Sequence, residues 1–305
     1  MKPSRFGRVL LPFITPFDRN GDVFYENFAR LINYAIDKNF LDTVIVTGTT
    51  GEFNTLSKEE RIGLYKTAVK AVNGRYPIIA GTGAASTRET IELTRAATEA
   101  GINTVMIVGP YYVKPTQRGI FNHYMEVLNN TTADIMIYNI PIFTGMNIEP
   151  ETVGKLAAAS KRFIGIKDES GVNPVQIIDY EYQVKDVNPD FLIYNGDDIM
   201  LMPTLACGAH GIVSGGSLLI GDKIRKVFSC FEEGKNGEAL RQYHYAYKLC
   251  RLFGINGRIH PNPMLRAAVE MVSGIEIGPA RLPLDQPTAE EKEAIKKALA
   301  EMQLI

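Results

Sequence analysis

The chain has 305 residues, of which 45% are hydrophobic, so it is long enough to bury a large core. Lys plus Arg total 33, Asp plus Glu total 34, and the formal net charge is -1. This balance argues against nucleic acid as a partner, because nucleic-acid-binding proteins show a basic excess or patch. No apolar run reaches the ~18 residues of a membrane span, and the charged segment 1–8 lacks the apolar core of a signal peptide. We therefore expect a soluble, cytoplasmic protein with no membrane partner.

Cysteine and histidine positions indicate neither disulfides nor a metal site. The three cysteines are an odd, sparse set, which predicts free thiols in a reducing compartment: Cys207, Cys230 and Cys250. The four histidines show no metal-ligand spacing: His123, His210, His244 and His260. Asp197 and Asp198 form an adjacent acidic pair at a predicted strand end, which is thin support for a metal. We expect no metal and no organic cofactor.

Short apolar runs alternate with longer amphipathic stretches, and the alternation repeats eight times. The predicted strands are Val9–Ile14, Thr43–Thr47, Pro77–Gly81, Thr104–Val108, Asp134–Tyr138, Phe163–Ile166, Phe191–Tyr194 and Gly211–Ser214. Helices are predicted around Phe24–Ile36 and at Lys58–Asn73, Ser86–Ala100, Arg118–Asn130, Glu149–Ala159, Val175–Val184 and Ile199–Ala206. Ser57 and Glu60 fit a capping box at the second helix, and Gly101 is placed to end the third.

Eight βα units without a second change of pattern predict an α/β fold of the (β/α)8 TIM-barrel type. The strands are mostly continuous apolar runs, as expected of strands covered on both sides. After Gly221 the strands stop, and helices are predicted at Lys223–Glu233, Glu238–Phe253, Pro263–Val272 and Ala289–Gln303. We predict a barrel core at residues 1–221, and the last barrel helix plus a C-terminal helical extension at 222–305.

Lys167 directly follows the sixth predicted strand. In such barrels the catalytic residues lie at the C-terminal ends of the strands and in the loops that follow. Apolar neighbours on the strand desolvate the amine, and desolvation favours its neutral, nucleophilic form. The alternative is a loop lysine in a salt bridge with Asp168 or Glu169, and position alone leaves both interpretations open.

Three further strand ends carry candidate groups. Tyr138 ends the fifth strand, where a tyrosine can shuttle protons or simply pack on Pro141. The second strand runs into Gly48-Thr49-Thr50-Gly51-Glu52, a turn whose backbone N–H groups and hydroxyls suit a carboxylate or phosphate. The turn is no P-loop, because no Gly-Lys-Ser/Thr follows. Pro110-Tyr111-Tyr112 places aromatic hydroxyls after the fourth strand.

The order of these motifs resembles the dihydrodipicolinate synthase / N-acetylneuraminate lyase family of class I, Schiff-base, pyruvate-dependent aldolases. The similarity rests on segments at successive strand ends and beyond the barrel: Thr15-Pro16-Phe17, Gly48-Thr49-Thr50-Gly51-Glu52, Gly81-Thr82-Gly83, Pro110-Tyr111-Tyr112-Val113-Lys114-Pro115, Tyr138-Asn139-Ile140-Pro141, Gly165-Ile166-Lys167-Asp168, Asn195-Gly196-Asp197-Asp198, Gly211-Ile212-Val213-Ser214, Asn262-Pro263 and Arg281-Leu282-Pro283-Leu284. Any one segment is weak, and the ordered set carries the resemblance.

The resemblance implies a role for each matching residue. Lys167 would form the Schiff base and Tyr138 would be the general acid/base. Thr49 and Tyr112 would complete a hydroxyl relay, with Tyr112 supplied by a neighbouring subunit of a homotetramer built as a dimer of dimers. The substrate-binding set would be the Gly48-Thr49-Thr50 turn, whose Thr50 and backbone hold the pyruvate carboxylate, the backbone carbonyl of Ile212, and the position of Phe143.

One departure from the family pattern bears on the substrate. Dihydrodipicolinate synthases usually carry an arginine for the aspartate semialdehyde carboxylate where this chain has Phe143. Phenylalanine cannot make that bidentate contact, and Asp168 after the lysine resembles the sugar-acid aldolases. Our leading hypothesis is therefore reversible cleavage of a 2-keto-3-deoxy sugar acid to pyruvate and an aldehyde.

Three alternatives remain. The first is 4-hydroxy-tetrahydrodipicolinate (dihydrodipicolinate) synthase, which condenses pyruvate with aspartate semialdehyde and would use an arginine elsewhere. An N-acetylneuraminate lyase is less favoured. A barrel that binds 2-oxo acids without catalysis belongs to another class of protein, and the joint presence of Lys167, Tyr138 and Thr49 argues against it.

Overall fold

A computed structural model describes residues 4–305, so residues 1–3 of the charged amino-terminal segment lie outside the described residues. Eight parallel strands follow one another in chain order, from β1 to β8, and close into a barrel. This confirms the (β/α)8 fold predicted from the alternation. The strands are β1 (Val9–Pro12), β2 (Thr43–Val46), β3 (Ile78–Gly81), β4 (Thr104–Val108), β5 (Asp134–Asn139), β6 (Phe163–Asp168), β7 (Leu192–Asn195) and β8 (Gly211–Val213).

The chain divides into two compact units, each described by itself. The first unit consists of residues up to Arg8 and of Ile78–Val213, and the second of Val9–Pro77 and Ser214–Ile305. The sequence-based boundary at residue 221 remains a prediction. In the first unit the helices are α3 (Thr87–Glu99), α4 (Gln117–Asn130), α5 (Pro141–Thr144), α6 (Pro150–Ala159), α7 (Gln176–Val184) and α8 (Leu201–Ala206).

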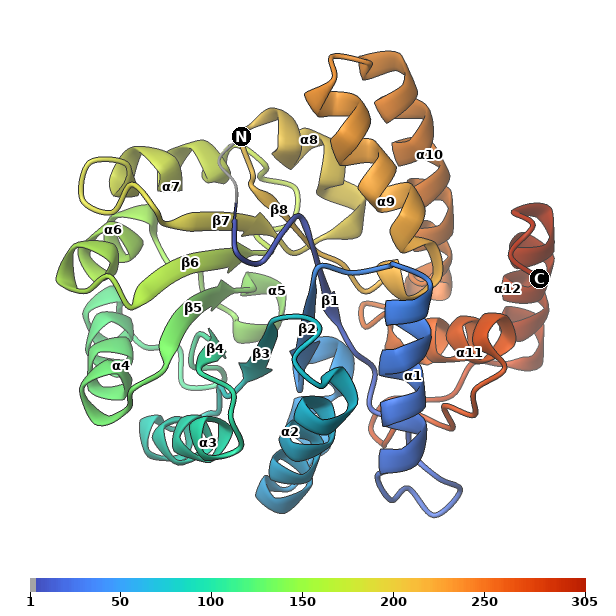
Figure 1. Cartoon of the computed structure of the whole chain (residues 1–305), viewed down its shortest axis with the longest axis horizontal. Helices are drawn as coiled ribbons and strands as arrows, with labels where there is room; N and C mark the ends of the chain where they lie inside the picture. The colour runs from blue at the N-terminus through green and yellow to red at the C-terminus, as the bar shows by residue number, and fades with distance from the viewer. Residues whose placement is uncertain (1–3) are drawn as a thin grey trace. The chain divides into compact units, whose positions relative to one another are not determined.

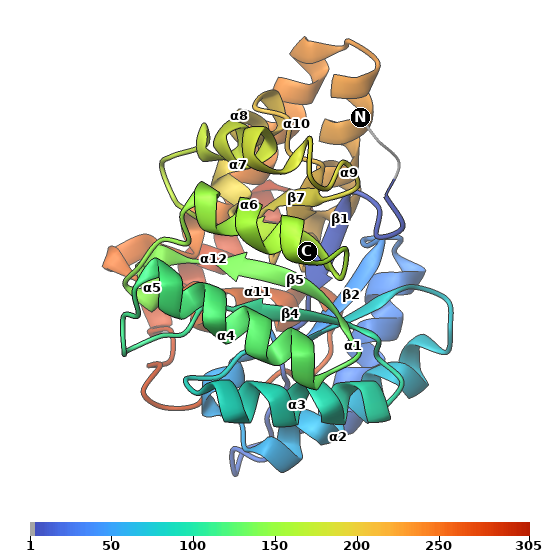
Figure 2. The same ribbon diagram turned by 90° about the vertical axis from the view of Figure 1, so that its left-hand side faces the viewer.

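The helices of the first unit cover the outer side of its strands. Figure 1 shows α4, α6 and α7 outside β5, β6 and β7, and Figure 2 shows α4 and α6 in front of β4 and β5. Both sides of the strands are therefore covered, and every residue of β4 is buried. Burial on both faces explains why the strands read as continuous apolar runs.

The second unit carries the remaining long helices. These are α1 (Tyr25–Asp37), α2 (Lys58–Val72), α9 (Ser217–Glu232), α10 (Asn236–Leu252), α11 (Asn262–Ser273) and α12 (Ala289–Glu301). The capping box predicted for α2 is confirmed, because Ser57 accepts from the Glu60 amide and Glu60 accepts from the Ser57 amide. Together these contacts satisfy two backbone donors that a helix N-terminus leaves open.

Among the differences from the sequence prediction are two boundaries and one helix. Strand β6 continues through Lys167 to Asp168, because both residues pair with β5 on one side and β7 on the other. Helix α9 begins at Ser217, six residues earlier than predicted, and is kinked at Ile220. The four-residue helix α5 was not predicted.

In the described part of the chain, no helix is long and apolar enough to cross a membrane. The same residues contain no group of three or more His, Cys, Asp or Glu side chains arranged to hold a metal ion. All three cysteines are free thiols, as predicted.

Candidate active site

Strands β5 and β6 bring Tyr138 and Lys167 together. The two residues are direct partners in the parallel ladder, so their side chains leave the sheet on the same face. The Lys167 Nζ atom lies 3.8 Å from the centroid of the Tyr138 ring. Both side chains are buried, with relative exposures of 5% for Lys167 and 2% for Tyr138. The two leading catalytic candidates therefore share one desolvated position at the carboxyl ends of adjacent strands.

Glu169 completes this pair, although the sequence indicates it only as a possible salt-bridge partner. Its Oε2 atom lies 3.0 Å from Lys167 Nζ, and the Tyr138 hydroxyl donates to the same oxygen at 2.8 Å. The salt bridge with Glu169 exists, but Lys167 belongs to the strand and not to a loop. Alternation along an extended chain was the available signal, because residues 167 and 169 fall on the same face.

Asp168 points to the opposite face and anchors the strand ends. Its carboxylate accepts hydrogen bonds from Asn139 at 2.8 Å, Ser170 at 2.7 Å and Gln176 at 3.1 Å. Burial raises the pKa of Asp168, and these three donors offset part of that rise. Since Asn139 and Asp168 follow Tyr138 and Lys167 directly, the buried bond between them holds Tyr138 and Lys167 in register.

Asp197 follows β7 and adds a second carboxyl group near the lysine. Burial, followed by repulsion from Glu169, raises the pKa of Asp197 to about 7. The backbone amide of Ile199 donates to its side chain at 3.0 Å, which partly offsets that rise. Groups of perturbed pKa gather at catalytic sites, so Asp197 joins the candidate set.

The other predicted residues of the first unit lie in the loop after β4, in α5 and in β8. Tyr112 follows β4 and is 93% exposed, with a left-handed backbone φ of 71°. For a bulky residue this conformation is an outlier, and such strain concentrates at functional sites. Phe143 lies in α5 and is 39% exposed. Ile212 lies in β8, where it is paired with Asn195 and fully buried.

The threonine turn lies in the second unit, where Thr49–Gly51 forms one 3-10 turn directly after Gly48. The side-chain amide of Asn262 donates to the Thr50 carbonyl at 3.0 Å. The adjacent Glu52 is fully buried and forms an ion pair with Arg266 at 2.9 Å. Burial raises the pKa of Glu52 and lowers that of Arg266 to about 10. Buried contacts therefore hold the turn in place. Its approach to Lys167 remains a prediction.

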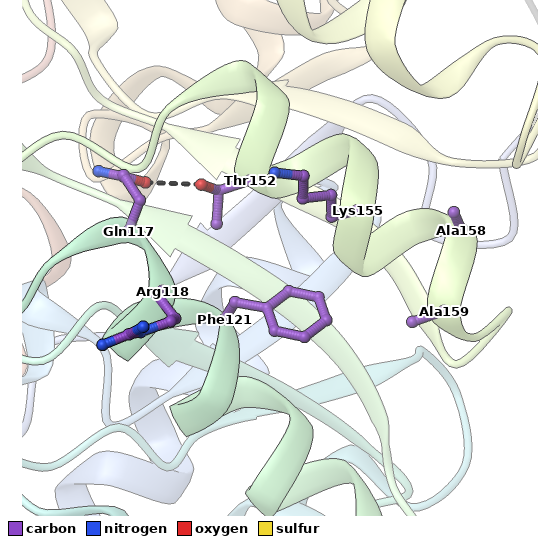
Figure 3. A pocket seen from close by; sticks show the side chains of 7 residues that line it. All are labelled: Gln117, Arg118, Phe121, Thr152, Lys155, Ala158 and Ala159. Carbon is purple, nitrogen blue, oxygen red and sulfur yellow. Dashed lines mark hydrogen bonds between the residues drawn. The ribbon is translucent and has the colours of Figure 1, made fainter.

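A groove on the helical layer is separate from these residues. It lies between α4 and α6 and has a volume of about 660 Å³. Figure 3 shows the Phe121 ring pointing from α4 toward α6, and Thr152 donating to Gln117 at 2.7 Å. The lining is completed by Arg118, Lys155, Ala158 and Ala159. None of the predicted catalytic residues lines this groove.

Comparison with known proteins places these features in context. Residues 5–302 match the dihydrodipicolinate synthetase family. A 4-hydroxy-tetrahydrodipicolinate synthase from Desulforudis audaxviator is 39% identical, over 98% of this chain and 99% of that protein. A dihydrodipicolinate synthase from Bacillus anthracis has 35% identity and a TM-score of 0.90, covering 98% of each chain.

A more distant structure is also similar. The prophage protein YagE from E. coli K12 belongs to the dihydrodipicolinic acid synthase family and was solved in complex with pyruvate. It is 25% identical, with a TM-score of 0.89 over 98% of this chain and 99% of that chain.

Proposed function

Because this chain belongs to the dihydrodipicolinate synthetase family of Schiff-base lyases, we propose that it acts as a 4-hydroxy-tetrahydrodipicolinate synthase. It would condense pyruvate with aspartate semialdehyde. The observation that carries the proposal is the buried pairing of Lys167 with Tyr138 on adjacent strand ends. The sequence alone favours sugar-acid cleavage, whereas the relatives favour the alternative, since curated synthases match almost the whole chain.

In the proposed reaction, Lys167 attacks the ketone of pyruvate and forms an imine. The imine draws electrons from the methyl carbon, so that carbon loses a proton and becomes a nucleophilic enamine. Tyr138 moves protons at the carbinolamine and at the new hydroxyl group. The Thr49–Thr50 turn would bind the pyruvate carboxylate, and the Ile212 carbonyl would lie near the nucleophilic carbon. No metal or organic cofactor enters these steps.

The second carboxylate, that of aspartate semialdehyde, needs a cation. Phe143 cannot supply one, and this observation keeps the sugar-acid reaction as the second candidate. Lys114 is a basic group close to the same segment. A Cβ atom built on Gly145 would lie 2.7 Å from Lys114 Cε, so the lysine side chain packs against the segment that carries Phe143. We therefore propose that Lys114 binds the semialdehyde carboxylate.

Borohydride reduction tests the mechanism. With pyruvate present, the wild type is expected to gain the mass of a reduced pyruvate adduct, and Lys167→Ala is expected to gain none. Absence of trapping in the wild type would remove the Schiff-base proposal. Parallel assays of pyruvate with aspartate semialdehyde and with glyceraldehyde then separate the two candidates. Faster turnover with glyceraldehyde would favour the sugar-acid reaction instead of the synthase reaction.

We also propose that the protein works in the cytoplasm as a homotetramer, a dimer of dimers, in which Tyr112 reaches a neighbouring subunit. The support is the exposure of Tyr112 (93%) and Val113 (63%) on one strained loop. Both side chains are available for contact with a neighbouring subunit. Sedimentation equilibrium measures the assembly, and a monomer at micromolar concentration would contradict it.

A further inference from the structure

One carboxylate oxygen contacts both groups that the proposed reaction needs. Glu169 Oε2 lies 3.0 Å from the nucleophilic nitrogen of Lys167 and 2.8 Å from the hydroxyl of Tyr138. These are ordinary hydrogen-bond distances, at which a proton passes between the heavy atoms without rearrangement. The family resemblance assigned no role to this residue.

The backbone places Glu169 there by continuing the strand. The Glu169 amide donates to the Asn139 carbonyl at 2.9 Å, which extends the β5–β6 ladder past Asp168. Gly196 leaves the space that the two side chains occupy. A Cβ atom at Gly196 would lie 2.6 Å from Lys167 Cε and 2.9 Å from Glu169 Cβ. The backbone at these strand ends therefore positions Lys167 and Glu169 next to each other.

Tyr138 on β5 contacts both members of this pair. Asp197, which follows β7, interacts electrostatically with both, and Asp198 adds to the raised pKa of Asp197. The charge of Glu169 contributes to the raised pKa of Asp197, so the two carboxyl groups sense one another. The side chain of Glu169 is 24% exposed, whereas that of Lys167 is only 6% exposed. Glu169 is therefore the partly exposed member of the Lys167–Glu169 pair. It can exchange protons with groups other than the buried Lys167 amine.

We propose that Glu169 takes the proton from Lys167 in imine formation and acts together with Tyr138, which deepens the proposed function and rests on it. Glu169 accepts a proton from the Lys167 ammonium group and leaves a neutral amine. The amine nitrogen bonds to the ketone carbon, the carbonyl π-bond opens, and the nitrogen's proton moves to the oxygen. Protonated Glu169 then returns its proton, directly or through Tyr138, to the carbinolamine hydroxyl. The carbon–oxygen bond breaks, water leaves, and a protonated imine and a carboxylate remain.

An alternative role for Glu169 predicts a change in the rate of imine formation in the opposite direction. If Glu169 only holds Lys167 as an ammonium ion, its removal frees the amine and speeds imine formation. If Glu169 transfers the proton, its removal slows imine formation, because the buried ammonium loses its acceptor. The direction of the rate change therefore decides between the two roles.

The experiment is a single-turnover measurement with pyruvate, borohydride quenching and intact mass spectrometry. Glu169→Gln is expected to form the imine roughly 100-fold more slowly than the wild type, the scale of general acid–base catalysis. The matched control is Glu181→Gln, which removes the same charge from the exposed face of α7 and is expected to keep the wild-type rate. An unchanged or faster rate in Glu169→Gln overturns the proposal.

A second variant separates catalysis from folding. Glu169→Ala leaves space for a small carboxylate, so added formate is expected to restore imine formation in that variant, with no effect on Glu169→Gln. Failure of formate to accelerate Glu169→Ala counts against the proposal. If the wild type itself traps no pyruvate, the proposed function fails. If the wild type traps pyruvate and Glu169→Gln traps it equally fast, only the role of Glu169 fails.

Discussion

Asp197 makes the stability of this protein depend on pH in a direction that can be calculated. Its pKa rises from 3.8 to about 7 in the folded chain. The folded state therefore holds a proton that the unfolded state releases between these values, so stability falls as pH rises through that window. The difference between the two pKa values corresponds to at most about 4 kcal/mol of lost stability at pH 8, and to less than about 1 kcal/mol at pH 4. Partial exposure of the side chain reduces both figures.

Replacement of Asp197 by Asn removes the titration and keeps an acceptor for the Ile199 amide. We expect Asp197→Asn to gain roughly 2 kcal/mol more in unfolding free energy at pH 8 than at pH 4, after the reduction for exposure. Urea denaturation at both values measures the difference, and the exposed Asp190→Asn serves as control. If Asp197→Asn changes the unfolding free energy equally at the two pH values, or destabilises the protein only at pH 8, the raised pKa of Asp197 is refuted.

Two further changes test other parts of the structure. Arg266→Met leaves Glu52 as an unpaired buried charge and is expected to cost about 3–5 kcal/mol in urea denaturation. A double variant with Glu52→Gln should recover part of that loss, and no recovery would contradict the buried pair. Lys114→Gln is expected to raise KM for aspartate semialdehyde about 10-fold or more, the scale of a lost charged hydrogen bond, with KM for pyruvate unchanged. Lys155→Gln is the control, and an equal change in both KM values would argue against carboxylate binding by Lys114.

The strands were predictable because each is covered on both faces, and burial on both faces requires a short, continuous apolar run. Their ends were less predictable, as β6 shows. Lys167 and Asp168 are charged, so local preference ends the strand at Ile166, whereas pairing on both sides carries it to Asp168. The tertiary ladder outweighs the local preference there. Helix α5 was missed for a related reason, since four residues starting at Pro141 contain no helical period.

The proximity of Tyr138 and Lys167 was predictable, but their immediate surroundings were not. Tyr138 and Lys167 could be inferred because strand ends of a parallel barrel meet at one edge. Alternation places Glu169 on their face only if the strand continues past Asp168, whereas local preference ends the predicted strand at Ile166. Arg266 pairs with Glu52 across more than two hundred residues, and no local pattern indicates a partner at that separation.

The two halves of the proposed reaction depend on different kinds of structure. The pyruvate half uses Lys167 and Tyr138, which are fixed by ladder pairing and, behind it, by the hydrogen bonds of Asp168. Such a site tolerates little change, because a shift in register moves every side chain to the other face. The acceptor half would depend on Lys114, which lies in a loop, and on Phe143, which lies in the short helix α5, and both segments can change without disturbing the strands. Similarity along the whole chain therefore speaks most strongly for imine chemistry, and in the proposed reaction the charge presented by these two segments would decide which aldehyde reacts.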